Sequence, residues 1–505
     1  MIGFIDGRSD ISREKFGAKA NSLNLLKSAG LNVPPAFVLS VESCRTFQQL
    51  GTLDFVHDPL ELGLDQLFNE CEIEGLFSKE LIEVSVRSGA PVSMPGMMET
   101  ILQVKIPRRR EGCRREMRKQ EITALLESIK AVYESWNSPR AIAYRKALGL
   151  PHDGGTGCII QSMVFGDRDT NSGTGIILTH DPNTGDKSMV GEYLHESRGD
   201  RLVGGYATPV SLSSLREDVP SLYEELQIAS SEVFSQFGAP QEIEFTVESG
   251  VLFFLQARKM NFTPVGEIQR QFRETQSGKI SRDEFFRNLT CIGVRSLYGS
   301  KILGVEQDSV IASGLPASPG IGKGRIKNCA EMLSSDVSLG SSVVLALQNT
   351  TPEDFPAMSA STAIVTNNGG VTSHAAVVAR SLGVPSVVGC GDVDFSVYDG
   401  MRVTVDGHQG RVILGDLQTA SLCYLEPDIH DTICSWFMES LTEDFTLEIT
   451  ENKNLPESGV EVPSFDLSKP EHILDLKLKR PEKAHTLFLS DNKLVSLVDT
   501  WQALH

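Results

Sequence analysis

The most constraining feature of this 505-residue chain is a pair of alternating runs on either side of residues 248–250, Glu-Ser-Gly. Every second position over 243–247 and over 251–255 is apolar. Successive side chains of a strand point to opposite faces, so the two runs predict a β-hairpin with one apolar face. A three-residue turn that ends in a glycine able to take positive φ would place Glu242 directly opposite Gln256.

The other face of this expected hairpin carries charge. Glu242, Glu244, Gln256 and Arg258 all project from it in the expected register. Carboxylates two positions apart on one face suit Mg²⁺, which prefers oxygen ligands and bridges nucleotide phosphates. An arginine beside them could neutralise phosphate charge. The alternative is an amphipathic hairpin whose outer face is only polar.

A second signal lies in residues 369–380, Gly-Gly-Val-Thr-Ser-His-Ala-Ala-Val-Val-Ala-Arg. A strand over 363–366 runs into the glycine pair, and a helix is expected to begin near Thr372 or Ser373, either of which can cap it. His374 would then lie in the first helical turn, where free N–H groups favour an anion. A histidine there suits transient phosphoryl transfer by nucleophilic catalysis, although most lone histidines are structural.

Composition and pattern set the class of protein. A net charge of −19 argues against nucleic-acid binding. We interpret the basic run over 108–119 as the solvated start of a helix. We expect no membrane span, since no apolar run approaches about 20 residues. The first residues lack the pattern of a signal peptide, and nine cysteines without CxxC spacing favour a reducing, cytoplasmic setting. The glycine-rich residues 320–324 match no phosphate-binding loop and should form a turn into a strand.

The order of the patterns along the chain predicts α/β and α+β multidomain architecture. A helix is expected over 19–29, a strand over 36–39, helical spacing over 120–148 and β-rich runs over 157–260. A later unit alternates strands, at 342–347, 362–366, 386–388 and 402–405, with helical pieces. The domain boundaries that we expect are 1–260, a helical connector over 261–309, a second unit over 310–418 and an extension over 419–505.

These segments resemble the pyruvate phosphate dikinase family. Residues 369–380 are similar to its phosphohistidine motif, and residues 84–100 resemble its nucleotide-binding stretch. Residues 17–23 resemble its first lysine motif, which usually has two glycines before the lysine. Residues 191–194 and 314–320 also match, and the likeness runs from about residue 17 to 416.

The resemblance implies an ATP-grasp nucleotide domain over 1–260 and a swivelling phosphohistidine domain over 310–418. It implies that the β-phosphoryl group of ATP moves to His374 and that inorganic phosphate takes the γ-phosphoryl group. Thr372 is similar to a regulatory phosphorylation site of plant relatives. The ATP and Mg²⁺ contacts that the resemblance implies fall on Lys19, Arg87, Glu242, Glu244, Gln256 and Arg258, with Glu244 and Gln256 as the metal ligands.

The acceptor is left open by the sequence. Fewer than 90 residues follow residue 416, whereas a pyruvate-binding (β/α)₈ barrel takes about 250. We therefore expect pyruvate bound by a separate acceptor subunit, or another small-molecule acceptor. A non-catalytic ATP-sensing protein is the alternative function. The extension over 419–505 is expected either to pack on the swivelling domain or to dock an acceptor subunit.

Overall fold

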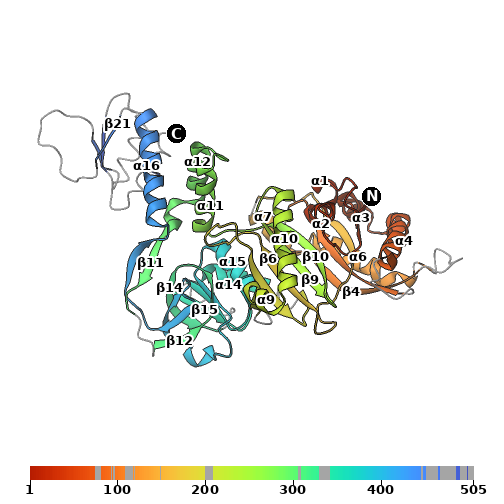
Figure 1. Ribbon diagram of the computed structural model, residues 1–505. Helices are drawn as coiled ribbons and strands as arrows, with labels where there is room; N and C mark the ends of the chain where they lie inside the picture. Colours follow the sequence, from red (N-terminus) through yellow and green to blue (C-terminus); the bar gives the residue numbers. More distant parts are fainter. Residues whose placement is uncertain are drawn as a thin grey trace, which may run out of the picture.

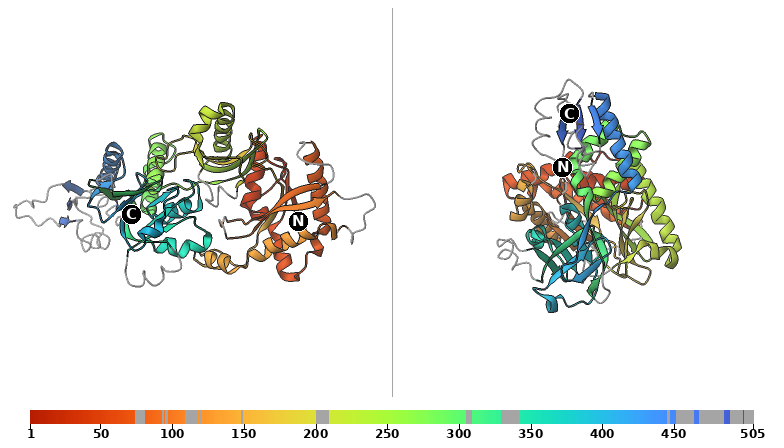
Figure 2. Two further views of the ribbon diagram at one scale, coloured as in Figure 1. Left: turned by 90° about the horizontal axis from the view of Figure 1, so that it is seen from below. Right: turned by 90° about the vertical axis from the view of Figure 1, so that its left-hand side faces the viewer.

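The computed structural model describes residues 1–73, 81–92, 94, 97–108, 118, 120–147, 149–199, 209–304, 309–328, 342–444, 447–450, 464–466, 485–488 and 498. The molecule is elongated, with a sheet that contains the N-terminal strand at one end and helix α16 (Pro427–Asp444) at the other (Figures 1 and 2). Within these ranges no helix combines the length and the apolar character that a membrane crossing requires.

The first sheet has five strands in the order β1-β2-β5-β3-β4. Their bounds are Ile2–Phe4 (β1), Ala36–Leu39 (β2), Leu81–Gly89 (β3), Thr100–Pro107 (β4) and Gly157–Ser162 (β5). Helices α3 (Val41–Leu50), α4 (His57–Ile73) and α6 (Thr123–Ser135) share one apolar core with it. The helical spacing expected over 120–148 is divided between α6 and a second helix, α7 (Pro139–Ala147).

Arg118 corrects the expectation that the basic run is solvated. Its side chain is only 1% exposed, its Nε lies 3.1 Å from Glu61, and its Nη1 donates to the Pro107 carbonyl at 2.7 Å. The charge is paired with carboxylates inside the first unit instead of facing water, and only Nη2 lacks a hydrogen-bond partner among the described residues. The neighbouring residues 109–117 and 119 lie outside the described residues.

The second sheet has the order β10-β9-β6-β7-β8. Its strands are Gly173–Leu178 (β6), Val190–His195 (β7), Val210–Ser211 (β8), Gln241–Glu248 (β9) and Val251–Lys259 (β10). Helices α2 (Ala18–Ser28), α9 (Leu212–Asp218) and α10 (Pro220–Phe237) bury one face of it in a core that includes Leu23, Ile243 and Phe245. The opposite face carries a small apolar cluster with Ile176 and Leu178, and next to it the polar side chains of β7 and β9.

The hairpin of β9 and β10 has a different register from the expected one. Val251 pairs with Glu248, so the turn holds two residues, Ser249 and Gly250, both with positive φ. This is the geometry of a primed hairpin turn. A β-bulge between Phe254 and Gln256 then shifts the register by one residue.

The bulge restores the arrangement of faces that the sequence predicted. Gln256 pairs with Glu244 and Arg258 with Glu242, so the four polar residues do share one face. On the core side Leu252, Phe254 and Ala257 replace the expected apolar positions of β10, and Val251 is 49% exposed. The predicted pairing of Glu242 with Gln256 is wrong, because a two-residue turn and a bulge together replace the three-residue turn.

The third unit is built on an eight-stranded sheet of order β12-β19-β18-β14-β15-β16-β17-β13, in which β14 to β17 run parallel. Helices α14 (Phe355–Ala360) and α15 (His374–Leu382) pack on it. The four strands expected from the sequence all form. The bounds are Val310–Ser313 (β12), Leu315–Ser318 (β13), Ile321–Lys327 (β14), Val343–Leu347 (β15), Ala363–Thr366 (β16), Ser386–Val388 (β17), Arg402–Asp406 (β18) and Arg411–Leu414 (β19).

The expected connector and the start of the extension form one helical unit. Helices α11 (Pro264–Gln276) and α12 (Arg282–Ile292) share a core with α16 that includes Phe272, Phe285 and Trp436. A two-stranded ribbon, β11 (Tyr298–Ile302) paired with β20 (Thr419–Cys423), joins this unit to the eight-stranded sheet. The structure therefore places α16 on the connector helices. Short strands β21 (Leu447–Thr450), β22 (Ser464–Asp466) and β23 (His485–Phe488) follow.

Candidate nucleotide and phosphohistidine site

Lys19 and Arg87 are brought together by close backbone packing at Gly17. Gly17 is the N-cap of α2 with φ 91°, and a Cβ atom there would lie 1.6 Å from the carbonyl oxygen of Gly89 at the end of β3. The Ala18 N–H also donates to the Ala90 carbonyl at 2.9 Å. Only the first position of the expected glycine pair needs a glycine, because Ala18 already has helical conformation.

The pKa of Lys19 is lowered to about 7. Burial is the main cause, and the Arg87 and Arg258 guanidinium groups add repulsion that the Glu244 carboxylate opposes. A phosphate group near this lysine would supply negative charge and restore the ammonium form. Such a side chain fits an anion-binding role.

Arg87 joins the two sheets of the first 260 residues. Its Nη1 donates to Gln161 Oε1 and to the Leu255 carbonyl, both at 3.1 Å, and its Nη2 donates to Gln256 Oε1 at 3.2 Å. Leu255 is the extra residue of the bulge in β10, so its carbonyl has no partner in the strand ladder. The same guanidinium lies 3.8 Å from Glu244.

Glu242 and Arg258 form an ion pair across the hairpin. The Arg258 Nε donates to Glu242 Oε1 at 3.0 Å, and a second nitrogen of the guanidinium also contacts that oxygen. The carboxylate of Glu242 is therefore directed at an arginine and not at a cation shared with Glu244. Binding of one metal ion by both glutamates stays a prediction.

Glu244 and Gln256 are adjacent, and the Gln256 Oε1, which accepts from Arg87 here, would have to be released for the two side chains to hold a metal ion together. They are directly paired across β9 and β10, and Gln256 Nε2 lies 3.4 Å from Glu244 Oε1. A carboxylate and an amide oxygen fit Mg²⁺, which usually takes one or two such ligands and completes its shell with water and phosphate oxygens. In the described part of the chain no three His, Cys, Asp or Glu side chains are grouped to bind a metal. The donor set thus fits Mg²⁺ that arrives with a nucleotide.

His374 is the first residue of helix α15, with Ser373 at the N-cap position. Its imidazole hydrogen-bonds to the backbone of Thr351, and its Nε2 is buried with no partner among the described residues. Burial lowers the pKa of His374, while the Thr351 backbone, Asp354 and Glu353 oppose that shift. The neutral ring, with one nitrogen free, is the form that can act as a nucleophile.

The expected capping by hydroxyl groups is not seen. The Ser373 hydroxyl makes no cap hydrogen bond and is buried without a partner in the described part of the protein. The Thr372 hydroxyl donates instead to Glu192 Oε2, and the Thr372 N–H donates to the same oxygen at 2.9 Å. The N–H group of Val371 contacts the other oxygen of that carboxylate.

Glu192 is the residue that sequence reasoning missed. It comes from β7 of the second sheet, is only 3% exposed, and fills the concave backbone ahead of His374. A Cβ atom on Gly370 would lie 2.1 Å from its Oε1, so the glycine is required for this approach. Burial raises the pKa of Glu192, and the three N–H and O–H donors oppose that shift. The motif at 191–194 was a signal of family likeness, but nothing local in it assigns this contact.

Strand pairing connects Glu192 to the nucleotide residues. Ile176 of β6 pairs with Glu192 on one side and with Glu244 on the other, and Glu244 pairs with Gln256. Directly paired residues share a face, so all four lie in one row on the same face. Neighbouring strands are about 4.8 Å apart, which puts the Glu192 backbone about 10 Å from that of Glu244. The loop before His374 is thus docked beside the nucleotide residues.

A second contact crosses between the same two parts of the chain. The Arg140 guanidinium of α7 donates to Glu99 at 2.6 Å and lies 3.8 Å from Glu353, which precedes α14. Glu353 is also an electrostatic neighbour of His374. The views of Figures 1 and 2 agree in placing the sheet that carries α14 and α15 beside the unit that contains β6 and α9.

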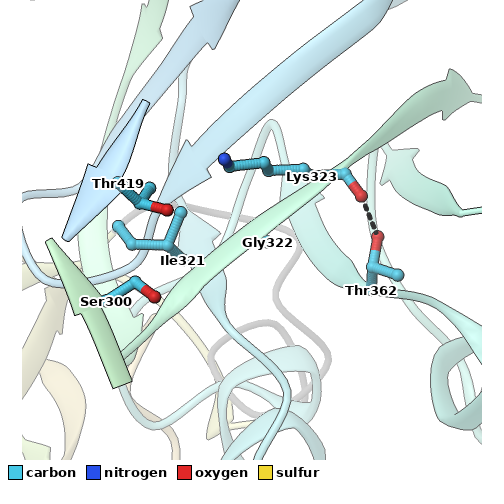
Figure 3. A pocket seen from close by; sticks show the side chains of 6 residues that line it. All are labelled: Ser300, Ile321, Gly322, Lys323, Thr362 and Thr419. Atoms are coloured by element: carbon cyan, nitrogen blue, oxygen red, sulfur yellow. Dashed lines mark hydrogen bonds between the residues drawn. The ribbon is translucent and has the colours of Figure 1, made fainter. Parts of the chain in front are cut away.

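The glycine-rich residues 320–324 have extended backbone and belong mostly to a strand. The expected turn is limited to Gly320, because residues 321–324 already lie in β14, where Gly322 and Gly324 pack closely against the backbone before β16 and β15. Lys323 donates to the Leu417 carbonyl at 2.5 Å, and its own carbonyl accepts from Thr362 at 2.9 Å (Figure 3). The adjoining cavity of about 380 Å³ also contacts Ser300 and Thr419 and is separate from the site at His374.

Comparison with known proteins agrees with this geometry. Residues 56–218 match the family described as pyruvate phosphate dikinase, AMP/ATP-binding domain, and residues 339–410 match the mobile domain of PEP-utilising enzymes. The chain is 27% identical to pyruvate, phosphate dikinase of Clostridium symbiosum, over 97% of this chain and 66% of the relative. It is 31% identical to the chloroplastic enzyme of Flaveria trinervia, over 82% of this chain and 53% of the relative.

Solved structures give weaker matches. An NMR structure of Enzyme I is 32% identical over 20% of this chain and 38% of that chain, with a TM-score of 0.14. A D-alanine–D-alanine ligase from Bacillus anthracis is 10% identical over 54% of this chain and 66% of that chain, with a TM-score of 0.23. Scores this low add nothing to the fold described above.

The fold and the site define a multidomain α/β protein in which an ATP-grasp nucleotide domain is followed by a mobile α/β domain. Within that class, the chain belongs to the pyruvate phosphate dikinase family. It spans between 53% and 66% of the length of the curated relatives named above.

Proposed function

We propose that this chain is an ATP-dependent phosphotransferase in which His374 accepts the β-phosphoryl group of ATP and passes it to an acceptor. The observation that carries the proposal is the docking of the loop before His374 on Glu192, in the same row of paired residues as Glu244 and Gln256. His374 also has a buried Nε2 without a hydrogen-bond partner among the described residues.

In the proposed reaction a nitrogen of the His374 ring attacks the β-phosphorus. An N–P bond forms, the bond from that phosphorus to the oxygen of the α-phosphate breaks, and AMP leaves. The γ-phosphoryl group passes to inorganic phosphate. Lys19, Arg87 and Arg258 would hold the phosphate oxygens, and Glu244 and Gln256 would hold Mg²⁺, which neutralises phosphate charge when it is bound.

Pyruvate is the first acceptor to test, because the curated relatives are named for it. The proposed division into a nucleotide domain over 1–260, a connector over 261–309, a carrier domain over 310–418 and an extension over 419–505 is consistent with this chemistry. The carrier domain would have to leave the nucleotide site in order to meet any acceptor bound elsewhere.

The test is to incubate the protein with Mg²⁺ and with ATP labelled at either the β or the γ phosphorus. We expect stable β label on the protein that acid removes and base does not, and AMP in solution. His374→Ala should lose the label. His408→Gln is the matched control, because His408 is another half-buried histidine of the same unit, in the turn between β18 and β19, and lies against Tyr424.

Each outcome has a clear meaning. Retained β label in wild type and in His408→Gln, but not in His374→Ala, supports the proposal, and a chase with pyruvate then tests the acceptor. Label that persists in His374→Ala, or bound ATP that stays unchanged in the wild type, would overturn it. Unchanged ATP would favour a protein that only binds the nucleotide.

A further inference from the structure

The glycine-rich strand β14 borders a cavity that the proposed reaction does not use. The cavity has a volume of about 380 Å³ and is lined by both the β11–β20 ribbon and the eight-stranded sheet (Figure 3). Its polar walls come from Ser300 of β11, Thr419 of β20, Lys323 of β14 and Thr362 just ahead of β16. A volume of this size lies at the lower end of the range for small-molecule sites. The cavity can therefore hold one small ligand that contacts the ribbon and the sheet together.

Lys323 is the cation of this cavity. Its side chain extends from β14 toward the ribbon, and its Nζ donates to the Leu417 carbonyl at 2.5 Å (Figure 3). An ammonium group has three N–H donors, so two of them are left for a ligand. No carboxylate of the described residues lies within ion-pairing distance of this ammonium group. A half-buried cation without a counter-ion is stabilised by an anion that binds beside it.

Two hydroxyl groups of the ribbon add further donors. The register of β11 and β20 places Ser300 and Thr419 on the same face of the ribbon. Neither hydroxyl has a hydrogen-bond partner in the part of the chain that the structure describes. The Thr362 hydroxyl is already bound to the carbonyls of Lys323 and Val343, at 2.9 and 2.8 Å, and can only accept from a ligand. The free donors of the cavity are thus two ammonium hydrogens and two hydroxyl groups, from three strands.

Positive charge also gathers on this face of the sheet, although the chain has a net charge of −19. Arg325 lies two residues beyond Lys323 on the same face of β14 and pairs with Arg402 of β18. Arg402 is neutralised by Asp416 at 2.7 Å. Arg325 donates to the Gly400 carbonyl at 2.7 Å and has no carboxylate partner among the described residues. Two uncompensated cations therefore attract anions to the cavity from outside.

We propose that this cavity binds a small phosphate-bearing molecule, a binding site that lies outside the proposed function and does not depend on it. A phosphate group has at least three oxygens that can accept the ammonium and hydroxyl hydrogens, whereas a carboxylate has only two. Lysine binds phosphate as a point charge, without the fixed geometry of a guanidinium group. The cavity is larger than one phosphate group, so it leaves room for a small organic substituent. A bound ligand would tie the ribbon to the sheet.

The experiment titrates the protein by calorimetry without nucleotide and without Mg²⁺. The probes are inorganic phosphate and glycerol 3-phosphate, with acetate as the carboxylate comparison. We expect both phosphate probes to bind and to raise the midpoint of thermal unfolding, while acetate does neither. Tighter binding of glycerol 3-phosphate would identify a phosphate monoester as the ligand, and tighter binding of inorganic phosphate would identify free phosphate.

Three variants locate the binding. Lys323→Gln removes the charge but keeps an N–H donor for the Leu417 carbonyl, and it should weaken phosphate binding at least about tenfold. Ser300→Leu fills the cavity without changing the lysine and should abolish binding. Lys301→Gln is the matched control, because Lys301 is exposed on the other face of β11 and should bind phosphate as the wild type does.

Phosphate affinity that is unchanged in both Lys323→Gln and Ser300→Leu would overturn the proposal. Binding of acetate as tight as that of phosphate would overturn it as well, as would the absence of binding by either phosphate probe at millimolar concentration. Loss of binding in Lys19→Met but not in Lys323→Gln would assign the phosphate to the nucleotide site instead. Should Lys323→Gln fail to fold, Ser300→Leu decides the same question. The titration contains no ATP and follows no label, so its failure leaves the proposed function standing.

Discussion

Arg87 donates a hydrogen bond of 3.1 Å to the backbone carbonyl of Leu255, the extra residue in the bulge of β10. The bulge turns Gln256 and Arg258 to the polar face, and the carbonyl that it releases from the strand ladder is bound by an arginine of the other sheet. One local irregularity thus sets both the faces of the hairpin and the position of Arg87.

Arg87→Lys tests this relationship. The ammonium group of lysine cannot replace a planar guanidinium group that donates hydrogen bonds to Gln161, Leu255 and Gln256. At about 1 kcal/mol for each of three hydrogen bonds, the free energy of unfolding should fall by about 3 kcal/mol. ATP affinity, measured by calorimetry, should fall at least about tenfold, which corresponds to 1.4 kcal/mol. Arg168→Lys, at a half-exposed pair with Glu248, is the control and should leave both quantities nearly unchanged. Equal effects of the two substitutions would contradict the role of the bulge.

Lys19 makes nucleotide binding dependent on pH. Its pKa is about 7 in the folded protein and 10.5 ordinarily, so the unfolded chain holds more protons between these values. The contribution of Lys19 to the free energy of unfolding should therefore increase as pH rises from about 7 to 10.5. Phosphates raise the pKa again, so ATP binding at pH 8 should take up close to one proton, and affinity should fall as pH rises above 7.

Calorimetry at pH 8 in buffers of different ionisation enthalpy measures that proton uptake. Lys19→Met should abolish it. Lys27→Met, on the same helix and paired with Glu70 at 3.8 Å, should keep it. Proton uptake that survives in Lys19→Met would show that another group is responsible.

Thr372 is placed where a negative charge would oppose docking. The residue is only 4% exposed, and its hydroxyl donates to the buried carboxylate of Glu192. Thr372→Glu would put a second carboxylate against the first, and we expect β-label transfer to His374 to slow by at least about a hundredfold. Thr372→Val removes only the hydroxyl and should slow it by no more than about tenfold, as expected for one hydrogen bond.

Ser381→Glu is the matched control for this series, since Ser381 is exposed on the same helix. Rates are measured by rapid quench with β-labelled ATP. A Thr372→Glu protein that loads as fast as Ser381→Glu would show that this carboxylate contact does not govern docking. The regulatory role of Thr372 remains a prediction that follows from the same contact.

Arg118 and Arg108 provide a comparison of stability within the basic run. Arg118 is 1% exposed against Glu61, whereas Arg108 is 39% exposed in its ion pair with Glu72 at 2.9 Å. Arg118→Ala leaves a buried carboxylate and should lower the free energy of unfolding by about 3 kcal/mol. Arg108→Ala should cost no more than about 1 kcal/mol. Urea denaturation of both variants measures the difference, and similar losses would mean that Arg118 is in effect solvated.

The sequence by itself determined the elements and the identity of the chemical groups. Alternation over 242–258 predicted a hairpin with Glu242, Glu244, Gln256 and Arg258 on one face, and that face exists. The glycine turn and the helix start predicted His374 in the first helical turn, and the residue is the first of α15. Such features depend on neighbours within a few residues, which is why the chain's local pattern is enough to predict them.

The tertiary structure alone decided the partners. A turn of two residues, corrected by a bulge, changed which residues are opposite each other, because the register depends on turn geometry and on Arg87 from another sheet. Glu192 contacts Thr372 from 180 residues away, and Arg118 finds Glu61 across 57. Nothing in the sequence indicates that a carboxylate on one strand will bind the free N–H groups ahead of one particular helix. These groups meet only when the two sheets and the mobile domain pack together. Burial then makes an unpaired charge unfavourable in free energy, so each buried charge needs a partner.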